Sequence, residues 1–158
     1  MLLDAQGEVL RPVIFSNDTR AASIARDAAN SPSRARVFAK TRQALYPGQT
    51  AVLLQWIRDN EPSVYSRIDR VLLVKDFIRW KFTGVPLSDF SDFGATGLMN
   101  LDSKSYDAGL LSDQGLDDIA QALPELRHGV DIGGHVTAAA SIATGVRVGL
   151  PEIGRAHV

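Results

Sequence analysis

Asn17, Asp18 and Arg20 bring an amide, a carboxylate and a guanidinium close together in the sequence. The carboxylate accepts hydrogen bonds, the guanidinium donates them and the amide does both, so together they suit a ligand with several polar groups. A second interpretation is structural: the segment caps a helix, and Asp18 pairs locally with Arg20. Both interpretations stay open. Tyr46 and Gln49 flank a Pro-Gly turn, which we interpret first as an ordinary turn before a helix and second as a further ligand contact.

Several other groups of residues favour structure over chemistry. Gly94–Gly97 lacks the Lys-Ser/Thr ending and the strand-to-helix context of a phosphate-binding loop, so we predict a turn there. Trp56 and Trp80 lie at helical spacing among apolar residues and are predicted to belong to the core rather than to stack on a ligand. The histidines have no partner at metal-ligand spacing, so we predict no metal site; they are His128, His135 and His157.

The composition is that of an ordinary globular protein. The chain has 158 residues, which fits one domain, and 45% of them are hydrophobic and 22% charged. Lys plus Arg number 17 against 18 Asp plus Glu, so no overall field favours nucleic acid or an anionic membrane. Cysteine is absent, and no apolar run approaches the roughly 20 residues of a membrane span. We therefore expect a cytoplasmic protein, or part of one, with no nucleic-acid or membrane partner.

The hydrophobic pattern predicts helices that alternate with short strands, which is the α/β class. The apolar run Val71–Val74 predicts a strand covered on both faces, as in parallel sheets. Residues 1–15 predict a hairpin around the turn at Gln6-Gly7. The predicted helices lie at residues 20–29, after the cap Thr50, after Glu61, from Lys75 to the cap Gly84, and at residues 110–111, 119–123 and 138–144.

Four stretches of the sequence resemble, in order, the FGGY family of carbohydrate kinases, and within it the pentulose kinases. They are LLD…VLRP…ND-R at residues 2–20, PGQT…EP at residues 47–62, KDF…TG…SD at residues 75–92, and GHVT…TG…GLP at residues 134–151. Their order and spacing are kept across nearly the whole chain. This agreement is more specific than any single motif.

The resemblance implies a ribonuclease H-like, actin-type ATPase fold of two lobes, with residues 1–151 as part of the first lobe. It implies phosphoryl transfer from ATP, with Mg²⁺, to a sugar hydroxyl whose proton a base removes. The family's phosphate-binding turn is expected before Met1, and its catalytic Asp at or beside Val158, where the sequence reads GRAHV. We therefore expect no catalytic residue and no ATP or metal site in this chain, and no activity of the chain alone.

The resemblance also bears on the substrate. It assigns the sugar-binding side to Asn17, Asp18, Arg20 and Gln49. Leu53 replaces the family's usual Lys and Ser16 its usual aromatic residue, so the sequence is more similar to L-xylulose kinases than to D-xylulose kinases. The alternatives are a D-xylulose or polyol kinase of the same family, and a non-catalytic α/β domain that binds a sugar or a partner protein. The oligomeric state is left open.

The two ends of the sequence have their own interpretation. Residues 152–158, EIGRAHV, equal the in-frame translation of a common sequencing adapter, so we expect a foreign tail after Pro151. An apolar strand opens the chain without a lead-in, so we expect Met1 to be an internal or assigned start. Sequencing the source DNA tests the tail: the same codons within a longer reading frame would contradict it.

We predict that the chain by itself exposes sheet edge and apolar surface, and therefore aggregates or stays loosely packed. The strand expected at Val71–Val74 needs neighbours on both sides, and the resemblance places further strands of the lobe before Met1. Size-exclusion chromatography and a thermal melt are the measurements. A monodisperse monomer with a sharp, cooperative transition would contradict the prediction.

Overall fold

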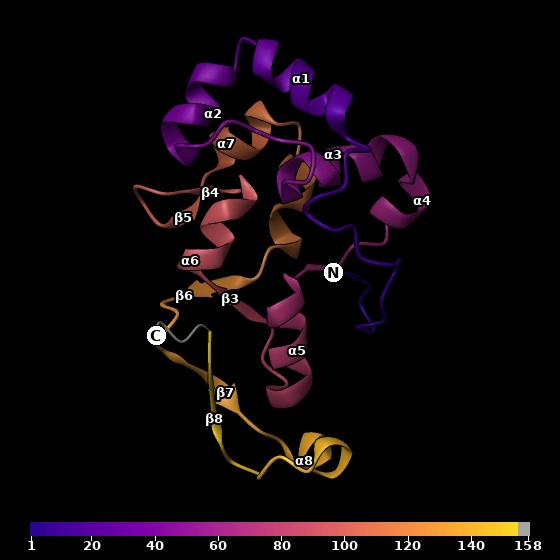
Figure 1. Ribbon diagram of the computed structural model, residues 1–158, viewed down its shortest axis with the longest axis vertical. Coiled ribbons are helices and arrows are strands. Elements are labelled where there is room, and N and C mark those ends of the chain that lie inside the picture. Colours follow the sequence, from indigo (N-terminus) through magenta and orange to yellow (C-terminus); the bar gives the residue numbers. More distant parts are fainter. Residues whose placement is uncertain (155–158) are drawn as a thin grey trace.

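The structure, a computed structural model, describes residues 1–154 and joins short helices to two-stranded sheets (Figure 1). The α-helices are α1 (Ala22–Asn30), α2 (Arg34–Thr41), α3 (Thr50–Asn60), α4 (Pro62–Tyr65), α5 (Val74–Thr83), α6 (Phe90–Phe93), α7 (Ala108–Asp113) and α8 (Ala138–Thr144), and the 3₁₀ helices are η1 (Gly94–Thr96) and η2 (Asp117–Ala122). The strands are β1 (Leu2–Leu3), β2 (Arg70–Val71), β3 (Leu87–Asp89), β4 (Met99–Asn100), β5 (Ser105–Tyr106), β6 (Glu125–Arg127), β7 (Ile132–His135) and β8 (Pro151–Ile153). The predicted α/β class is confirmed.

Helix α3 is the centre of the core because it is buried on two sides. Its Leu54 and Ile57 belong to the larger apolar cluster, which also contains Phe93 with no exposed surface. Its Val52 and Leu53 belong to a smaller cluster with residues of α1. The helix therefore fixes α1, and the loop before α1, relative to the rest of the molecule.

A separate arm lies at the end of the molecule opposite α1 and α2 (Figure 1). Strands β7 and β8 form an antiparallel pair, and α8 lies between them in sequence. The arm packs on α5, which contacts both α8 and β7. Next to α5, β3 and β6 pair in parallel, with Leu87 opposite Glu125.

The strand predicted at Val71–Val74 is shorter than expected and pairs differently. Only Arg70–Val71 is a strand, and it pairs antiparallel with β1. Leu72 is buried, but Val74 is 47% exposed and begins α5. Asp76 in the first turn favours this helix start, because a carboxylate is stabilised near a helix N-terminus. The prediction of a strand over Val71–Val74, covered on both faces as in parallel sheets, was therefore wrong.

The prediction that Trp80 belongs to the core was also wrong. The buried side chains of α5 are polar: Asp76, Arg79 and Thr83. Trp80 is half-buried and covers the turn at Gly7, where a Cβ atom would lie 2.6 Å from the indole ring. Lys81 lies over the same ring, 4.4 Å from its centroid. The aromatic side of α5 is thus a surface feature.

Other local predictions had mixed outcomes. Gly84 ends α5 in the left-handed conformation, at φ 76°, as predicted. Thr50 is the first residue of α3 rather than its cap, and no side chain caps that helix. Helix α2 was missed because its sequence RARVFAKT has a basic surface and few apolar residues. Residues 11–15 form no strand, so the predicted hairpin reduces to the bridge between Leu3 and Val9.

Replacing Phe93 with Ala should lower the free energy of unfolding by about 3–5 kcal/mol, because the ring is fully buried and its removal leaves a cavity. Urea denaturation of dilute protein, followed by tryptophan fluorescence, measures the loss. Ile142→Ala is the control: this side chain is 88% exposed, and its removal should change the free energy by less than about 0.5 kcal/mol. Equal effects of the two substitutions would contradict this prediction and would agree with the loose packing that the sequence predicts.

Candidate functional site

The loop before α1 and the turn before α3 lie against each other. A Cβ atom on Gly48 would be only 1.8 Å from the backbone oxygen of Ser16, so only glycine permits this approach. The contact places the exposed Asn17 beside the turn that contains Tyr46, whose side chain is 44% exposed. Residues far apart in the sequence thereby form one polar surface.

Asp18 and Arg20 form a two-point ion pair on this surface. The Asp18 carboxylate accepts hydrogen bonds from Nε and Nη2 of Arg20, each at 2.9 Å, and from the Arg20 backbone N–H. These hydrogen bonds hold the pKa of Asp18 below its usual range. The guanidinium lies 5.0 Å from the centroid of the Trp56 ring. The Asp18 pair predicted from the sequence is therefore present, but Asp18 does not cap α1, whose first flanking residue is Ala21.

Gln49 lies beneath the surface instead of on it. Its side chain is 1% exposed, and Nε2 donates to Gln43 Oε1 at 2.8 Å and to the Ala95 carbonyl at 3.1 Å. Its Oε1 atom has no hydrogen-bond partner within residues 1–154. Gln49 thus supports the turn from inside, and its role as a sugar contact stays a prediction.

A buried charged cluster was missed by the sequence analysis. Asp76 and Asp89 have no exposed surface, and Lys75 Nζ donates to both of them. Arg79, 4% exposed, donates to Asp76 and to the carbonyl of Leu87, and Ser88 donates to Asp76. The sequence signal is the pairs Lys75-Asp76 and Ser88-Asp89, which combine a carboxylate with a donor. Asp89 also caps α6, because its side chain accepts hydrogen bonds from the backbone N–H groups of Ser91 and Asp92.

The arm formed by β7, α8 and β8 packs against this cluster. A Cβ atom on Gly133 in β7 would lie 3.3 Å from Arg79, and one on Gly134 would lie 2.7 Å from Thr83. Gly154, directly after β8, lies against Asp89, since its Cβ atom would be 3.0 Å from Oδ2. The glycines of β7 and the glycine directly after β8 therefore let the arm approach the polar cluster closely.

Opposing effects act on the pKa values in this cluster. Burial raises the pKa of Asp89, but the Lys75 hydrogen bond and two backbone N–H groups outweigh it, so the pKa is lowered. Burial lowers the pKa of Lys75, but hydrogen bonds to Asp76 and Asp89 outweigh it, so the pKa is raised. Both groups are therefore charged near neutral pH.

The remaining site predictions concern catalysis and metal binding. The position at or beside Val158, where the family's catalytic Asp was expected, lies outside the described residues, as does His157. Within residues 1–154, no group of three or more His, Asp or Glu side chains is arranged to hold a metal ion. In the same range, no helix has the length and apolar character needed to cross a membrane.

The sequence matches the FGGY family of carbohydrate kinases, N-terminal domain, over residues 1–157. It is 33% identical over 153 residues to the L-xylulose/3-keto-L-gulonate kinase of Escherichia coli K12, covering 97% of this chain and 31% of that protein. It is 39% identical over 133 residues to the xylulose kinase of the same organism, covering 84% of this chain and 27% of that protein. The chain thus spans about a third of the length of these relatives.

Comparison with solved structures points to the same family. A xylulose kinase from Rhodospirillum rubrum superposes with a TM-score of 0.87 at 30% identity, covering 97% of this chain and 31% of that one. A kinase from Brucella ovis, described as a xyloylose kinase, superposes with a TM-score of 0.84 at 34% identity and the same coverage. The fold is therefore that of the actin-like ATPase sugar kinases, seen in a part of their first lobe. The chain belongs to the FGGY family of carbohydrate kinases.

We predict that Asp89→Asn lowers the free energy of unfolding near neutral pH by about 1.5–3 kcal/mol, the contribution of a hydrogen bond to a charged group. The folded pKa of Asp89 is depressed, so its stabilisation is complete above its ordinary pKa of 3.8 and is lost as the pH falls through the folded value. The folded pKa of Lys75 is raised above 10.5, so its stabilisation is complete below that pH and is lost as the pH rises further.

Urea midpoints measured across the pH range check this. The wild type should be most stable between these two limits, and Asp89→Asn should show a weaker dependence on pH at both ends. Asp102→Asn is the control, because this carboxylate is 68% exposed in its pair with Arg42. A pH profile of Asp89→Asn parallel to that of the wild type would contradict the role of the cluster.

Proposed function

We propose that this chain is the sugar-binding side of the first lobe of an ATP-dependent kinase that phosphorylates a hydroxyl of a ketopentose such as L-xylulose. The surface that combines Asn17, the Asp18–Arg20 pair and the turn at Tyr46 supports this proposal. It offers paired hydrogen-bond donors and acceptors at fixed places, which a polyhydroxylated substrate requires. Gln49 then acts by holding the turn, and its own contact with the sugar remains part of the proposal.

One observation carries the preference for L-xylulose. Ser16 and Leu53, two positions that depart from the family's usual residues, line the same groove of about 290 Å³, together with Gly48. Because Ser16 and Leu53 line one groove, both differences from the family pattern alter the same binding surface. The relative described as an L-xylulose/3-keto-L-gulonate kinase also matches the chain over 97% of its length. A D-xylulose or polyol substrate is the alternative within the family, because a xylulose kinase is 39% identical over a shorter stretch.

We propose that the catalytic base and the sites for ATP and Mg²⁺ belong to other parts of the whole enzyme, as the resemblance implies. A base that removes the hydroxyl proton typically contributes about 10²–10⁴ in rate. On this proposal the chain by itself is inactive. The cytoplasmic location predicted from the sequence also remains a proposal.

A non-catalytic sugar- or partner-binding domain is the candidate from another class. The coding sequence upstream of Met1 separates the two functions. An in-frame strand ending in Asp-x-Gly-Thr supports the kinase, because this turn approaches the nucleotide phosphates in the family. A genuine start codon at Met1 without such a strand supports the non-catalytic domain.

We predict that the whole enzyme consumes ATP fastest, by kcat/KM, with L-xylulose when tested against D-xylulose, xylitol and glycerol in a coupled assay. Asp18→Asn should lower kcat/KM about 10–100-fold, because a hydrogen bond to a charged group is lost at the substrate surface. Asp102→Asn, on an exposed loop, should leave it unchanged. A preference for D-xylulose would overturn the substrate, whereas no ATP consumption with any of these compounds would overturn the kinase.

A further inference from the structure

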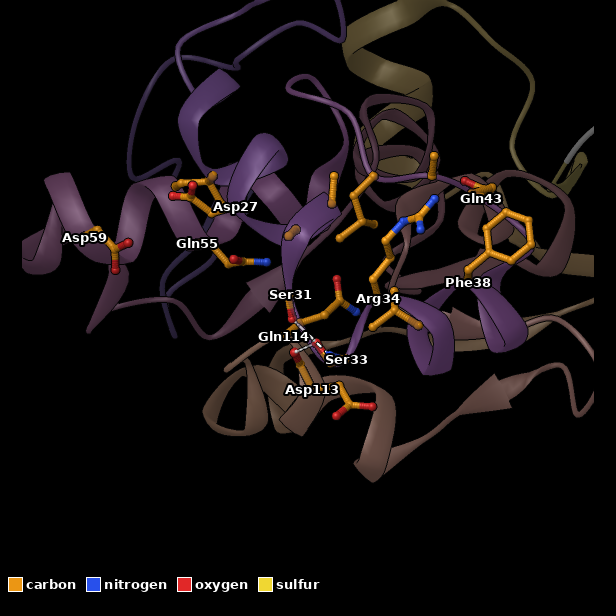
Figure 2. Close-up of a pocket in the computed structure, with 16 residues that line it drawn as sticks. Asp27, Ser31, Ser33, Arg34, Phe38, Gln43, Gln55, Asp59, Asp113 and Gln114 are labelled. Atoms are coloured by element: carbon orange, nitrogen blue, oxygen red, sulfur yellow. Dashed lines mark hydrogen bonds between the residues drawn. The ribbon is translucent and has the colours of Figure 1, made fainter.

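A second pocket, of about 390 Å³, lies between α1, α2 and α3 and the end of α7 (Figure 2). Its volume lies in the range of small-molecule sites. None of its lining residues lines the groove at Ser16 and Gly48. The pocket is thus distinct from the proposed substrate surface.

Gln114 supplies an unmet hydrogen-bond acceptor in the wall of this pocket. The residue is 7% exposed, and its Nε2 atom donates to the carbonyls of Gly97 at 2.9 Å and Leu110 at 3.3 Å. These bonds fix the orientation of the amide, which leaves Oε1 without a partner within residues 1–154. Figure 2 shows the amide directed into the pocket. A buried acceptor of this kind favours a ligand that donates a hydrogen bond.

Four charged side chains line the pocket: Asp27, Arg34, Asp59 and Asp113. Asp59 is paired with Arg58 and Asp113 with Arg36, and neither arginine lines the pocket. Asp27 of α1 and Arg34 of α2 both line it, and among the described residues neither takes part in an ion pair (Figure 2). Asp27 accepts hydrogen bonds and Arg34 donates them. The apolar side chains of Ile24, Val37 and Leu45 cover the surface between the polar groups.

We propose that this pocket is an auxiliary binding site for a neutral, polyhydroxylated molecule of monosaccharide size. A hydroxyl group both donates and accepts, so one kind of group satisfies Gln114 Oε1 and Asp27 as acceptors and Arg34 as a donor. The C–H faces of such a molecule pack on the apolar side chains. An ion of either sign would meet a like charge at Asp27 or Arg34.

The pocket has a direct hydrogen-bonded connection to the proposed substrate turn. Gln43 lines the pocket, and its Oε1 atom accepts the 2.8 Å hydrogen bond from Gln49. Gln43 Nε2 in turn donates to the Gly94 carbonyl. A ligand that moves Gln43 therefore acts on the turn before α3. Only this consequence for catalysis rests on the proposed function; binding in the pocket does not.

Equilibrium dialysis of the chain against radiolabelled xylitol, without ATP, tests the site. We expect saturable binding that Ala28→Trp abolishes, because Ala28 lines the pocket and an indole there fills it. Ser23→Trp places the same side chain on α1 away from the pocket and should leave binding unchanged. Arg34→Ala removes an exposed side chain and should weaken binding about tenfold, which corresponds to one hydrogen bond to a charged group.

Two further measurements decide the outcome. Ser16→Trp obstructs the other groove, so retained binding in this variant assigns the xylitol to the pocket, and loss of binding overturns the proposal. If 5-aminopentanoate, which carries one positive and one negative group, competes better than unlabelled xylitol, the ligand is recognised by charged groups. That result would overturn the proposal of an uncharged, polyhydroxylated ligand. Absence of saturable binding to the wild type, or unchanged binding in both Ala28→Trp and Arg34→Ala, would overturn the site itself. None of these results depends on kinase activity.

Discussion

The buried contact of Lys75 with Asp76 and Asp89 is the interaction on which the arrangement of this chain depends. It joins α5 to β3, and Arg79 extends it to the carbonyl of Leu87. Removing Asp76 would leave Arg79, 4% exposed, without its carboxylate partner, which is costly in a medium of low dielectric constant. Removing Asp89 would leave Lys75 with Asp76 and the more distant Asp92. The arm packs against the same polar face of α5 at Gly133 and Gly134. One charged cluster therefore fixes three elements that the apolar core does not reach.

At the other end of the molecule, the close approach of two backbone segments at Gly48 and Ser16 fixes the arrangement. Gly48 lets the turn before α3 touch Ser16, and α3 carries the Trp56 ring on which Arg20 rests. Because α3 is buried on two sides, both polar segments are held by one rigid helix. The substrate surface that we propose is thus positioned by packing, although its side chains are exposed.

Two hydrogen-bonded glutamines connect the sites. Gln49 supports the turn beside the proposed substrate surface, and Gln43 extends from it to the pocket between α1, α2 and α3. A buried amide network is stable when its members are satisfied and costly when they are not. The side-chain oxygen atoms of Gln49 and Gln114 have no hydrogen-bond partner within residues 1–154, so we expect a bound ligand to contribute most there.

The sequence by itself determined the family, the α/β class, the ion pair of Asp18 with Arg20 and the left-handed end of α5 at Gly84, because ordered motifs and local backbone preferences carry these features. It did not determine the length of β2, the polar burial of α5, helix α2 or the buried position of Gln49. Tertiary structure decided these, since Lys75 and Asp89 become partners only when α5 and β3 meet. The periodicity of the apolar residues predicts that Trp80 is buried. In the structure the face of α5 that carries Asp76 and Arg79 is buried instead.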